Sequence, residues 1–367
     1  VEGLPMIIQI IHQLFLVAMV TAFSFAQGFW GNEFPEGKIK YEPKTYVCYR
    51  TTDAVILDGK ITEKAWESVS WTETFVDIEG DLKPKPYHDT KVKMLWDKDY
   101  FYFAVYMEEP HVWATLTERD AVIYKDNDFE IFLDPDGDTH NYYELEVNAL
   151  ETEWDLILLK PYHDDEKVVI DSWDIPGLIT QVHVDGTLND PSDTDKSWSV
   201  EIAIPWNSFI SNYRSNTPPK EGEQWKVNFS RVQWETDIVG GKYVKTDSPE
   251  FNWVWSPQGL IYMHMPDLWG LVQFTELSPK KNKVEFKDSE LDQIKWALRQ
   301  VYYRQRNHYF KNEKYTSSIS SLSLTKAPTK SIPWPPKIVL TPSGWEASLD
   351  WNEQRVIIRK DGKVWAE

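Results

Sequence analysis

The sequence contains a single cysteine, Cys48, among its 367 residues. A disulfide within the chain is therefore excluded, and the folded state must be stabilised by an apolar core. No C-x-x-C pair and no C-x-x-C-H sequence occurs either. Zinc ribbons and c-type haem attachment, which need those spacings, are thereby excluded.

Long apolar segments are also missing. Leu14–Phe25 is an apolar run of 12 residues, too short to span a bilayer, and it ends at Ala26 before Gln27. This pattern predicts a secretory signal peptide over residues 1–26, starting at Met6, and therefore a bacterial protein exported to the periplasm or secreted. No membrane insertion is expected after cleavage. A frayed apolar N-terminal helix is the alternative.

Positive charge is scarce, with 39 Lys and Arg against 58 Asp and Glu and a net charge of −19. Nucleic acids and anionic membrane surfaces are bound by clustered Lys and Arg, so neither is an expected partner. A neutral oligo- or polysaccharide is compatible with an acidic protein, although the charge also serves simply to keep a secreted protein in solution.

Aromatic residues, in contrast, are abundant: they make up 14% of the chain and include 19 Trp. Many of them lie in short alternating or apolar segments separated by turn signals, which is typical of strands. These segments are Lys91–Trp96, Tyr100–Met107, Phe129–Leu133, Tyr142–Asn148, Glu153–Leu159, Ile179–Val184, Ser197–Ile204 and Gln224–Gln233. With one short helix expected at Thr62–Ser68, the pattern predicts an all-β fold, an antiparallel jelly-roll-like β-sandwich.

The strand period is lost after Ser278. Between residues 288 and 312, apolar residues recur at helical spacing behind a cap at Asp288 or Ser289. After a Pro-rich break, Val356–Arg359 and Lys363–Trp365 predict a hairpin. We therefore expect a C-terminal helix-plus-hairpin appendage over residues 277–367, with neither its role nor a protein partner indicated.

In front of this appendage we expect the sandwich at residues 46–276 and a leading arm at residues 27–45. Five motifs in the sandwich occur in the order and spacing of a known family. They are Asp58–Trp66, Val92–Ala104, Asp128–Asp134, Trp198–Trp206 and Trp269–Phe274. Together they resemble the family 9 carbohydrate-binding modules and their relatives in the DOMON-like β-sandwich superfamily, over roughly residues 45–275.

The resemblance implies that the end of a glycan is clamped between two aromatic side chains, with charged and amide side chains holding its hydroxyls. Tyr124, six residues before Glu130, stands at the first aromatic position, and Glu130 matches the family's hydrogen-bonding glutamate. Glu146 stands where the family has an arginine. Met263 stands at the second aromatic position, so that Tyr262 or His264 takes its place or the glycan follows another aromatic row.

Six further ligand-binding candidates are aromatic or polar residues near these segments: Trp113, Trp154, Trp253, Arg119, Arg231 and Asn148. Sugar rings stack on flat aromatic surfaces, while amide and guanidinium groups suit vicinal hydroxyls. Each also has a structural alternative. The tryptophans could be core residues, Arg119 could form a loop salt bridge, and Arg231 could be paired within its strand.

Asp134, Asp136 and Asp138 surround Gly137 at alternate positions, an arrangement that suits calcium. The distal glutamate of an EF-hand is missing, so a plain turn is the alternative, although relatives in the family do use structural calcium. No other cofactor is expected.

Three functions remain open. The first is a non-catalytic carbohydrate-binding protein in polysaccharide recognition or breakdown. The second is a glycoside hydrolase that pairs Glu130 with Glu144 or Glu146, since such enzymes need two carboxyls at suitable separation. The third is a haem-binding electron-transfer protein of the DOMON type, with ligands from Met263–Met265 and Met94.

The polar segment around Glu130 favours the first of these functions. Asp126, Asn127 and Asp128 are expected to form a well-solvated rim, which gives no reason for a raised carboxyl pKa. Hydrolysis by acid–base catalysis needs one carboxyl kept protonated in an apolar environment. The sequence therefore predicts that sugar is bound but not cleaved.

Overall fold

The computed structural model of the chain describes residues 34, 36–163, 168–209, 217–279, 283–329 and 332–367. The expected signal peptide lies outside these residues. The chain divides into two compact units, a larger one with Gly37–Asp292 and Asp361–Trp365, and a smaller one that includes Gln293–Lys360 and Ala366–Glu367. Within the described part of the chain, no helix has the length and apolarity needed to cross a membrane.

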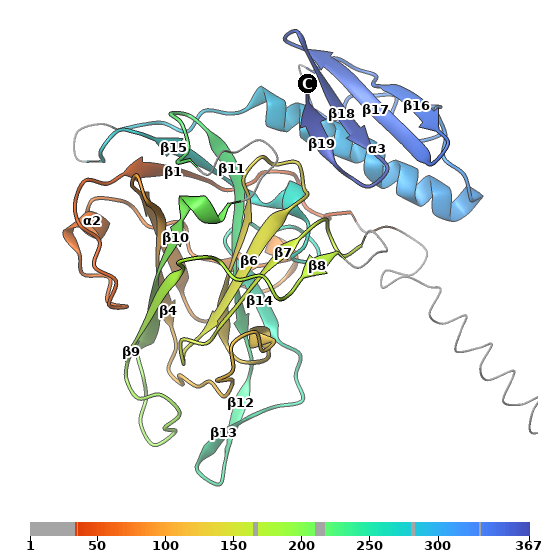
Figure 1. Cartoon of the computed structure of the whole chain (residues 1–367). Helices are drawn as coiled ribbons and strands as arrows, with labels where there is room; N and C mark the ends of the chain where they lie inside the picture. Colours follow the sequence, from red (N-terminus) through yellow and green to blue (C-terminus); the bar gives the residue numbers. More distant parts are fainter. Residues whose placement is uncertain (1–33, 35, 164–167, 210–216, 280–282, 330–331) are drawn as a thin grey trace, which may run out of the picture. The chain divides into compact units, whose positions relative to one another are not determined.

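The larger unit is a β-sandwich, as the sequence predicts (Figure 1). Its sheet has the strand order β8-β7-β6-β5-β11-β15-β1-β3-β4-β10-β9, with β14 beside β11 and β2 beside β14. The strands are β1 (Thr45–Arg50), β2 (Val76–Asp77), β3 (Thr90–Trp96), β4 (Tyr100–Glu108), β5 (Asp128–Asp134), β6 (Tyr142–Asn148), β7 (Glu153–Leu158), β8 (Val169–Ile170), β9 (Ile179–Asp185), β10 (Ser197–Pro205), β11 (Gln224–Gln233), β14 (Phe251–Val254) and β15 (Gly270–Thr275).

Side chains from both halves of this sheet meet in one core. Phe129 and Ile131 of β5 are 0% and 1% exposed, and they share the core with Phe101 and Phe103 of β4 and Phe229 of β11. Phe129 and Phe229 stack at 5.8 Å between ring centroids. The alternate residues of each strand face away from this core, so a polar residue can follow every buried aromatic.

Strand β1 departs from the antiparallel arrangement that the sequence predicts. It pairs in parallel with β15, where Thr45 lies opposite Leu271, and in parallel with β3, where Tyr49 lies opposite Leu95. Neither neighbour follows β1 through a hairpin, and long connections permit parallel pairing. The strand joins the two halves of the sandwich.

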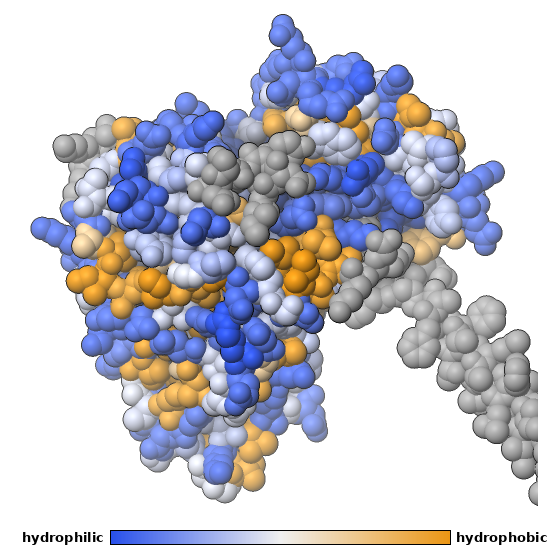
Figure 2. Space-filling view, viewed as in Figure 1, coloured by the Kyte–Doolittle hydropathy of each residue, from blue (hydrophilic) through white to orange (hydrophobic). Residues whose placement is uncertain are grey.

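Several short elements lie between the strands of the sandwich in the sequence. The expected helix at Thr62–Ser68 is α2 (Lys64–Glu67). The described residues also form the 3₁₀ turns η1 (Gly80–Leu82), η2 (Ile123–Lys125), η3 (Trp206–Ser208) and η4 (Pro266–Leu268). A separate hairpin is formed by β12 (Thr236–Val239) and β13 (Lys242–Lys245), at the lower end of the larger unit in Figure 1. Its Ile238, Val239 and Val244 are exposed, and apolar surface reaches this end of the view in Figure 2.

The C-terminal region contains the expected helix, α3 (Glu290–Asn312), capped by Ser289, whose hydroxyl oxygen accepts a hydrogen bond from Asp292 N at 3.1 Å. A four-stranded sheet follows, with β16 (Lys337–Thr341), β17 (Gly344–Trp351), β18 (Gln354–Arg359) and β19 (Val364–Ala366) in that order. The expected hairpin corresponds to β18 and β19. Strands β16 and β17 were not predicted.

Candidate functional site

The alternation of β5 and β6 puts four carboxyl side chains on the side of the sheet that faces away from the core. They are Asp128, Glu130, Glu144 and Glu146, which we call the carboxyl cluster. Glu130 lies directly opposite Glu146 in the register of the two strands. One carboxylate oxygen each from Asp128, Glu130 and Glu146 lie within 4.8 Å of one another.

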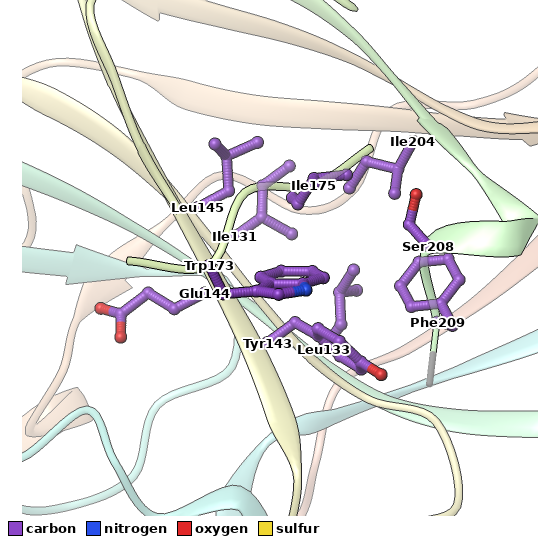
Figure 3. A pocket seen from close by; sticks show the side chains of 10 residues that line it. All are labelled: Ile131, Leu133, Tyr143, Glu144, Leu145, Trp173, Ile175, Ile204, Ser208 and Phe209. Atoms are coloured by element: carbon purple, nitrogen blue, oxygen red, sulfur yellow. The ribbon is translucent and has the colours of Figure 1, made fainter. Parts of the chain in front are cut away.

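The opposite sides of the same strands show the alternation directly. In Figure 3, Glu144 points away from the apolar side chains of Ile131, Tyr143 and Leu145, which enclose a small space inside the core together with Trp173. The space measures about 10 Å³, close to the lower limit for one water molecule. The strands are thus firmly packed behind the carboxyl cluster.

The carboxyl cluster is buried rather than solvated. Asp128 and Glu146 are 0% and 1% exposed, and Glu130 and Glu144 are each 5% exposed. Burial raises the pKa of Glu130 to about 7, and the Ser230 hydroxyl on the neighbouring strand only partly offsets this. Burial, followed by repulsion from neighbouring carboxylates, raises the pKa of the other three well above the usual range.

The sequence prediction of a well-solvated rim with ordinary pKa values was therefore wrong. The alternation of strand residues identifies the side of the sheet on which a carboxyl lies, but not how deeply loops cover it. Here the turn η2 lies over β6, and Tyr124 N donates a hydrogen bond to Glu146 Oε2 at 2.9 Å. Asp128 Oδ2 has no hydrogen-bond partner within the described part of the chain.

Two exposed tyrosines stand beside the carboxyl cluster. Tyr124 in η2 is 40% exposed and Tyr162, in the loop after β7, is 41% exposed. Partial burial raises the pKa of Tyr124, and the charges of Glu146 and Glu130 raise it further. The pKa of Tyr162 is raised in the same way, by burial and then by Glu144, Glu146 and Tyr124. Both phenol rings therefore lie near the same carboxyls.

Tyr162 was not among the sequence candidates. It lies in a loop, where aromatic residues follow no period that a sequence pattern could detect. The predicted residue His264 lies beside Tyr162, with the two rings edge-on at 4.5 Å between centroids. The ring of a second predicted residue, Tyr262, lies 5.7 Å from the His264 ring, also edge-on.

His264 is a neutral component of this aromatic group. Its Nδ1 lies 3.0 Å from the hydroxyl of Tyr142, and burial lowers the pKa of its imidazole to about 3. Met263 packs against the apolar cluster around Trp269, whereas Met94 lies in the sandwich core. Met94 and Met263 thus belong to different apolar clusters.

Among the remaining predicted site residues, Trp154 is the one that lies on the same side of the sheet as the carboxyl cluster and has a partly exposed ring. It is half-buried on β7, directly opposite Glu146, and packs against the apolar cluster that contains Phe132 and Tyr142. Asn148 lies on this side too, but it is 0% exposed. Its amide nitrogen donates to Leu116 O at 2.9 Å and to Asp126 Oδ2 at 3.1 Å, so it holds a loop.

Trp253 and Arg231 are buried, and the exposed Arg119 is held by structural salt bridges. Trp253 is 1% exposed in the sandwich core, with the Arg231 guanidinium 5.2 Å from its ring centroid. Arg231 is itself 1% exposed and forms a salt bridge with Glu109 at 3.0 Å. Arg119 binds the carboxylates of Glu153, Asp155 and Asp174, the last two at 2.7 Å and 3.0 Å. Trp113, 5% exposed, lines a separate cavity.

Three aspartates, one at the end of β5 and two in the turn after it, converge as calcium ligands do. One carboxylate oxygen each of Asp134, Asp136 and Asp138 lie within 4.8 Å of one another. The oxygens of Asp134 also accept hydrogen bonds from Gly137 N at 3.0 Å and Thr139 N at 2.9 Å. Lys363 forms a salt bridge with Asp138 at 2.9 Å. The donor set fits a hard cation, although the same contacts also stabilise a plain turn.

Comparisons with known proteins agree with the sequence resemblance. The family described as "Carbohydrate family 9 binding domain-like" matches residues 56–237. No curated protein matches the chain.

Three solved structures match parts of the chain. A family 9 carbohydrate-binding module from Caldicellulosiruptor kristjanssonii in complex with cellotriose is 16% identical, with a TM-score of 0.40, 67% of this chain and 100% of that chain covered. A family 9 module from the same organism in complex with glucose is 16% identical, with a TM-score of 0.40, and the match covers 65% of this chain and 100% of that chain. A protein from Bacteroides uniformis ATCC 8492 that is proposed to bind carbohydrate is 17% identical, with a TM-score of 0.46. The match covers 64% of this chain and 100% of that chain.

Proposed function

We propose that the chain is a non-catalytic carbohydrate-binding protein whose ligand site is the surface between Tyr124 and Tyr162, because residues 56–237 match the carbohydrate family 9 binding domain-like family. We further propose that it is exported and acts in the recognition or breakdown of polysaccharides, on the strength of the apolar run Leu14–Phe25.

The observation that carries the proposed site is the pair of exposed phenol rings beside buried carboxyls. A pyranose presents apolar C–H faces and a rim of hydroxyls, so it suits flat rings on its faces and planar polar groups at its edge. Tyr124 and Tyr162 supply the rings at 40% and 41% exposure. Glu130, Glu144 and Glu146 supply the polar groups.

Raised pKa values make these carboxyls versatile partners for hydroxyls. A protonated carboxyl both donates and accepts hydrogen bonds, whereas a carboxylate only accepts them. With its pKa near 7, Glu130 has access to both forms near neutral pH. A neutral hydroxyl group, itself donor and acceptor, matches such a partner.

The site is tested by removing each tyrosine ring. Tyr124→Ala and Tyr162→Ala should each weaken binding of a neutral oligosaccharide at least tenfold, on the order of 1–3 kcal/mol for one anchor residue. Isothermal titration with gluco-, xylo- and manno-oligosaccharides, cellotriose included, measures this. Tyr309→Ala, at a tyrosine of the smaller unit that is 45% exposed, serves as the matched control. Unchanged affinity in both site variants would rule out this surface.

A glycoside hydrolase is the second candidate, because burial of Glu130 gives it the raised pKa of a general acid. One carboxylate oxygen each of Asp128 and Glu146 lies within 4.8 Å of an oxygen of Glu130. Burial raises the pKa of these two carboxyls as well, which disfavours the ionised partner carboxylate that a glycosidase needs. We therefore expect no new reducing ends on incubation with these oligosaccharides, and turnover that Glu130→Gln abolishes would reverse the assignment.

A further inference from the structure

A second cavity, of about 350 Å³, opens in the larger unit. We call it the hairpin cavity, since β12 contributes to its wall. Its other lining comes from the loops before β3 and after β4, from Asn127 and from the end of β11. No member of the carboxyl cluster lines it, and neither Tyr124 nor Tyr162 does. The volume lies at the lower end of the range for small-molecule sites, roughly 300–1,000 Å³.

Aromatic side chains in the wall are held in place by the protein itself. Tyr87, 53% exposed, meets the ring of buried Trp253 edge-on at 4.8 Å. Trp234 donates its backbone N–H to Asn127 Oδ1 at 2.7 Å and its indole Nε1–H to Tyr124 O at 2.9 Å. These contacts fix both rings in place, which lowers the entropy lost when a ligand stacks on them.

The floor of the hairpin cavity is a buried polar network. Glu109, 2% exposed, forms the salt bridge with Arg231 and accepts a hydrogen bond from Gln233 Nε2 at 2.9 Å. His111 N donates to the other carboxylate oxygen of Glu109 at 3.0 Å. The arrangement explains why Arg231 and Trp253 are buried, since they support this floor and the Tyr87 ring.

The charge of the wall indicates the class of ligand. None of the described residues that line the cavity is Lys or Arg, and Glu235 and Asp237 add exposed carboxylates. The positive charge of Arg231 is already compensated by Glu109. Lys245 Nζ lies 3.8 Å from the centroid of the Trp234 ring, but the three carboxylates of Glu109, Glu235 and Asp237 outnumber the two cations Lys245 and Arg231. Uronic acids and sulfated sugars are therefore disfavoured.

Trp113 adds a buried aromatic ring to the wall of the cavity. It is 5% exposed, and its indole nitrogen is buried beneath the surface of the cavity, without a hydrogen-bond partner within the described part of the chain. Trp113 therefore contributes apolar surface to the wall and not a hydrogen-bond donor that a ligand reaches.

We propose that the hairpin cavity is a second carbohydrate-binding site, which takes a neutral mono- or disaccharide unit against Tyr87 and Trp234. The proposal rests on the proposed function for the class of ligand, but it uses a separate set of residues. The protein would then hold carbohydrate at two places, one beside the carboxyl cluster and one in the hairpin cavity.

The test uses the full chain with the first site disabled. The double variant Tyr124→Ala/Tyr162→Ala is titrated calorimetrically with neutral gluco-, xylo- and manno-oligosaccharides and with glucuronic acid. We expect it to retain binding of a neutral sugar that the wild type binds, and not to bind glucuronic acid. Adding Tyr87→Ala should weaken the retained binding at least tenfold, whereas Tyr87→Phe, which keeps the ring, should change it less than threefold.

Imidazole NMR signals of His88 and His111, two lining residues, provide a local readout. They should shift when sugar is added to the double variant, and the same sugar concentration should shift them much less when Tyr87→Ala is added. A double variant that binds no sugar, while the wild type does, overturns the second site and leaves the proposed function intact. Retained binding that Tyr87→Ala does not weaken also overturns it. A wild type that binds none of these sugars overturns both.

Discussion

Glu130 connects the binding surface to the stability of the fold. Its pKa is about 7 in the folded protein, above the 4.5 of an ordinary glutamate. Between these two pH values the folded state keeps a proton that the unfolded state releases, so stability falls as the pH rises through this window. For this one group the loss is on the order of 3 kcal/mol.

We predict that Glu130→Gln reduces this loss. The variant carries a neutral side chain at every pH, so its free energy of unfolding should decline less between pH 5 and pH 8 than that of the wild type. At pH 8 the variant should be the more stable of the two. Urea unfolding at both pH values measures this. Equal slopes with pH in both proteins would show that Glu130 is solvated.

Asp136 offers a second test at the residue scale. We propose that Asp134, Asp136 and Asp138 bind calcium, because their carboxylate oxygens converge within 4.8 Å. Calcium at a hundredfold excess over its Kd should then stabilise the wild type by about 2.7 kcal/mol relative to chelator. Asp136→Asn should lose most of that gain in thermal unfolding, whereas Asp89→Asn, at an exposed aspartate, should keep it. If calcium does not change the thermal unfolding of the wild type, the three aspartates form a plain turn and not a calcium site.

Much of the candidate site follows from local sequence, and part of it does not. Alternation puts Glu130 and Glu146 on one side of the sheet, and the resemblance brings in Tyr124. Tyr162 and the burial of the carboxyls depend on how loops cover the sheet, which no short-range pattern encodes. The same holds for Trp253, because a tryptophan on a strand has the same period whether its side of the sheet is open or covered.

At the scale of elements, the strands are where sequence and structure agree best. The expected bounds of β6 and β11 are the observed ones, Tyr142–Asn148 and Gln224–Gln233. Period and turn signals define these strands locally. The partners of β1 are set by the tertiary fold, since it pairs with residues as far away as Leu271. Strand β16 is mostly exposed and has no buried period to detect.

The start of helix α3 depends on one side chain that can be tested. Ser289 Oγ accepts the hydrogen bond of Asp292 N at 3.1 Å. Ser289→Ala should therefore lower the free energy of unfolding by about 1 kcal/mol, whereas Ser289→Asp should retain the cap. Urea unfolding followed by circular dichroism measures both variants. Identical stability of the alanine and aspartate variants would exclude a role for this cap.

At the scale of the molecule, acidic charge and aromatic content have a common explanation. A net charge of −19 suits a partner without charge, and aromatic rings fill both the core and the open surfaces. Core tryptophans such as Trp253 support exposed rings such as Tyr87, which meets it at 4.8 Å. The sandwich thus fixes flat rings and polar groups before a ligand arrives, which lowers the entropy lost on binding.

The most direct test of the central claim is a crystal structure of the full chain with a neutral oligosaccharide that it binds in solution. We predict density for an intact sugar ring between the phenol rings of Tyr124 and Tyr162, with hydroxyls hydrogen-bonded to Glu130, Glu144 or Glu146. Sugar found only elsewhere on the protein, or found cleaved beside Glu130, would contradict the account.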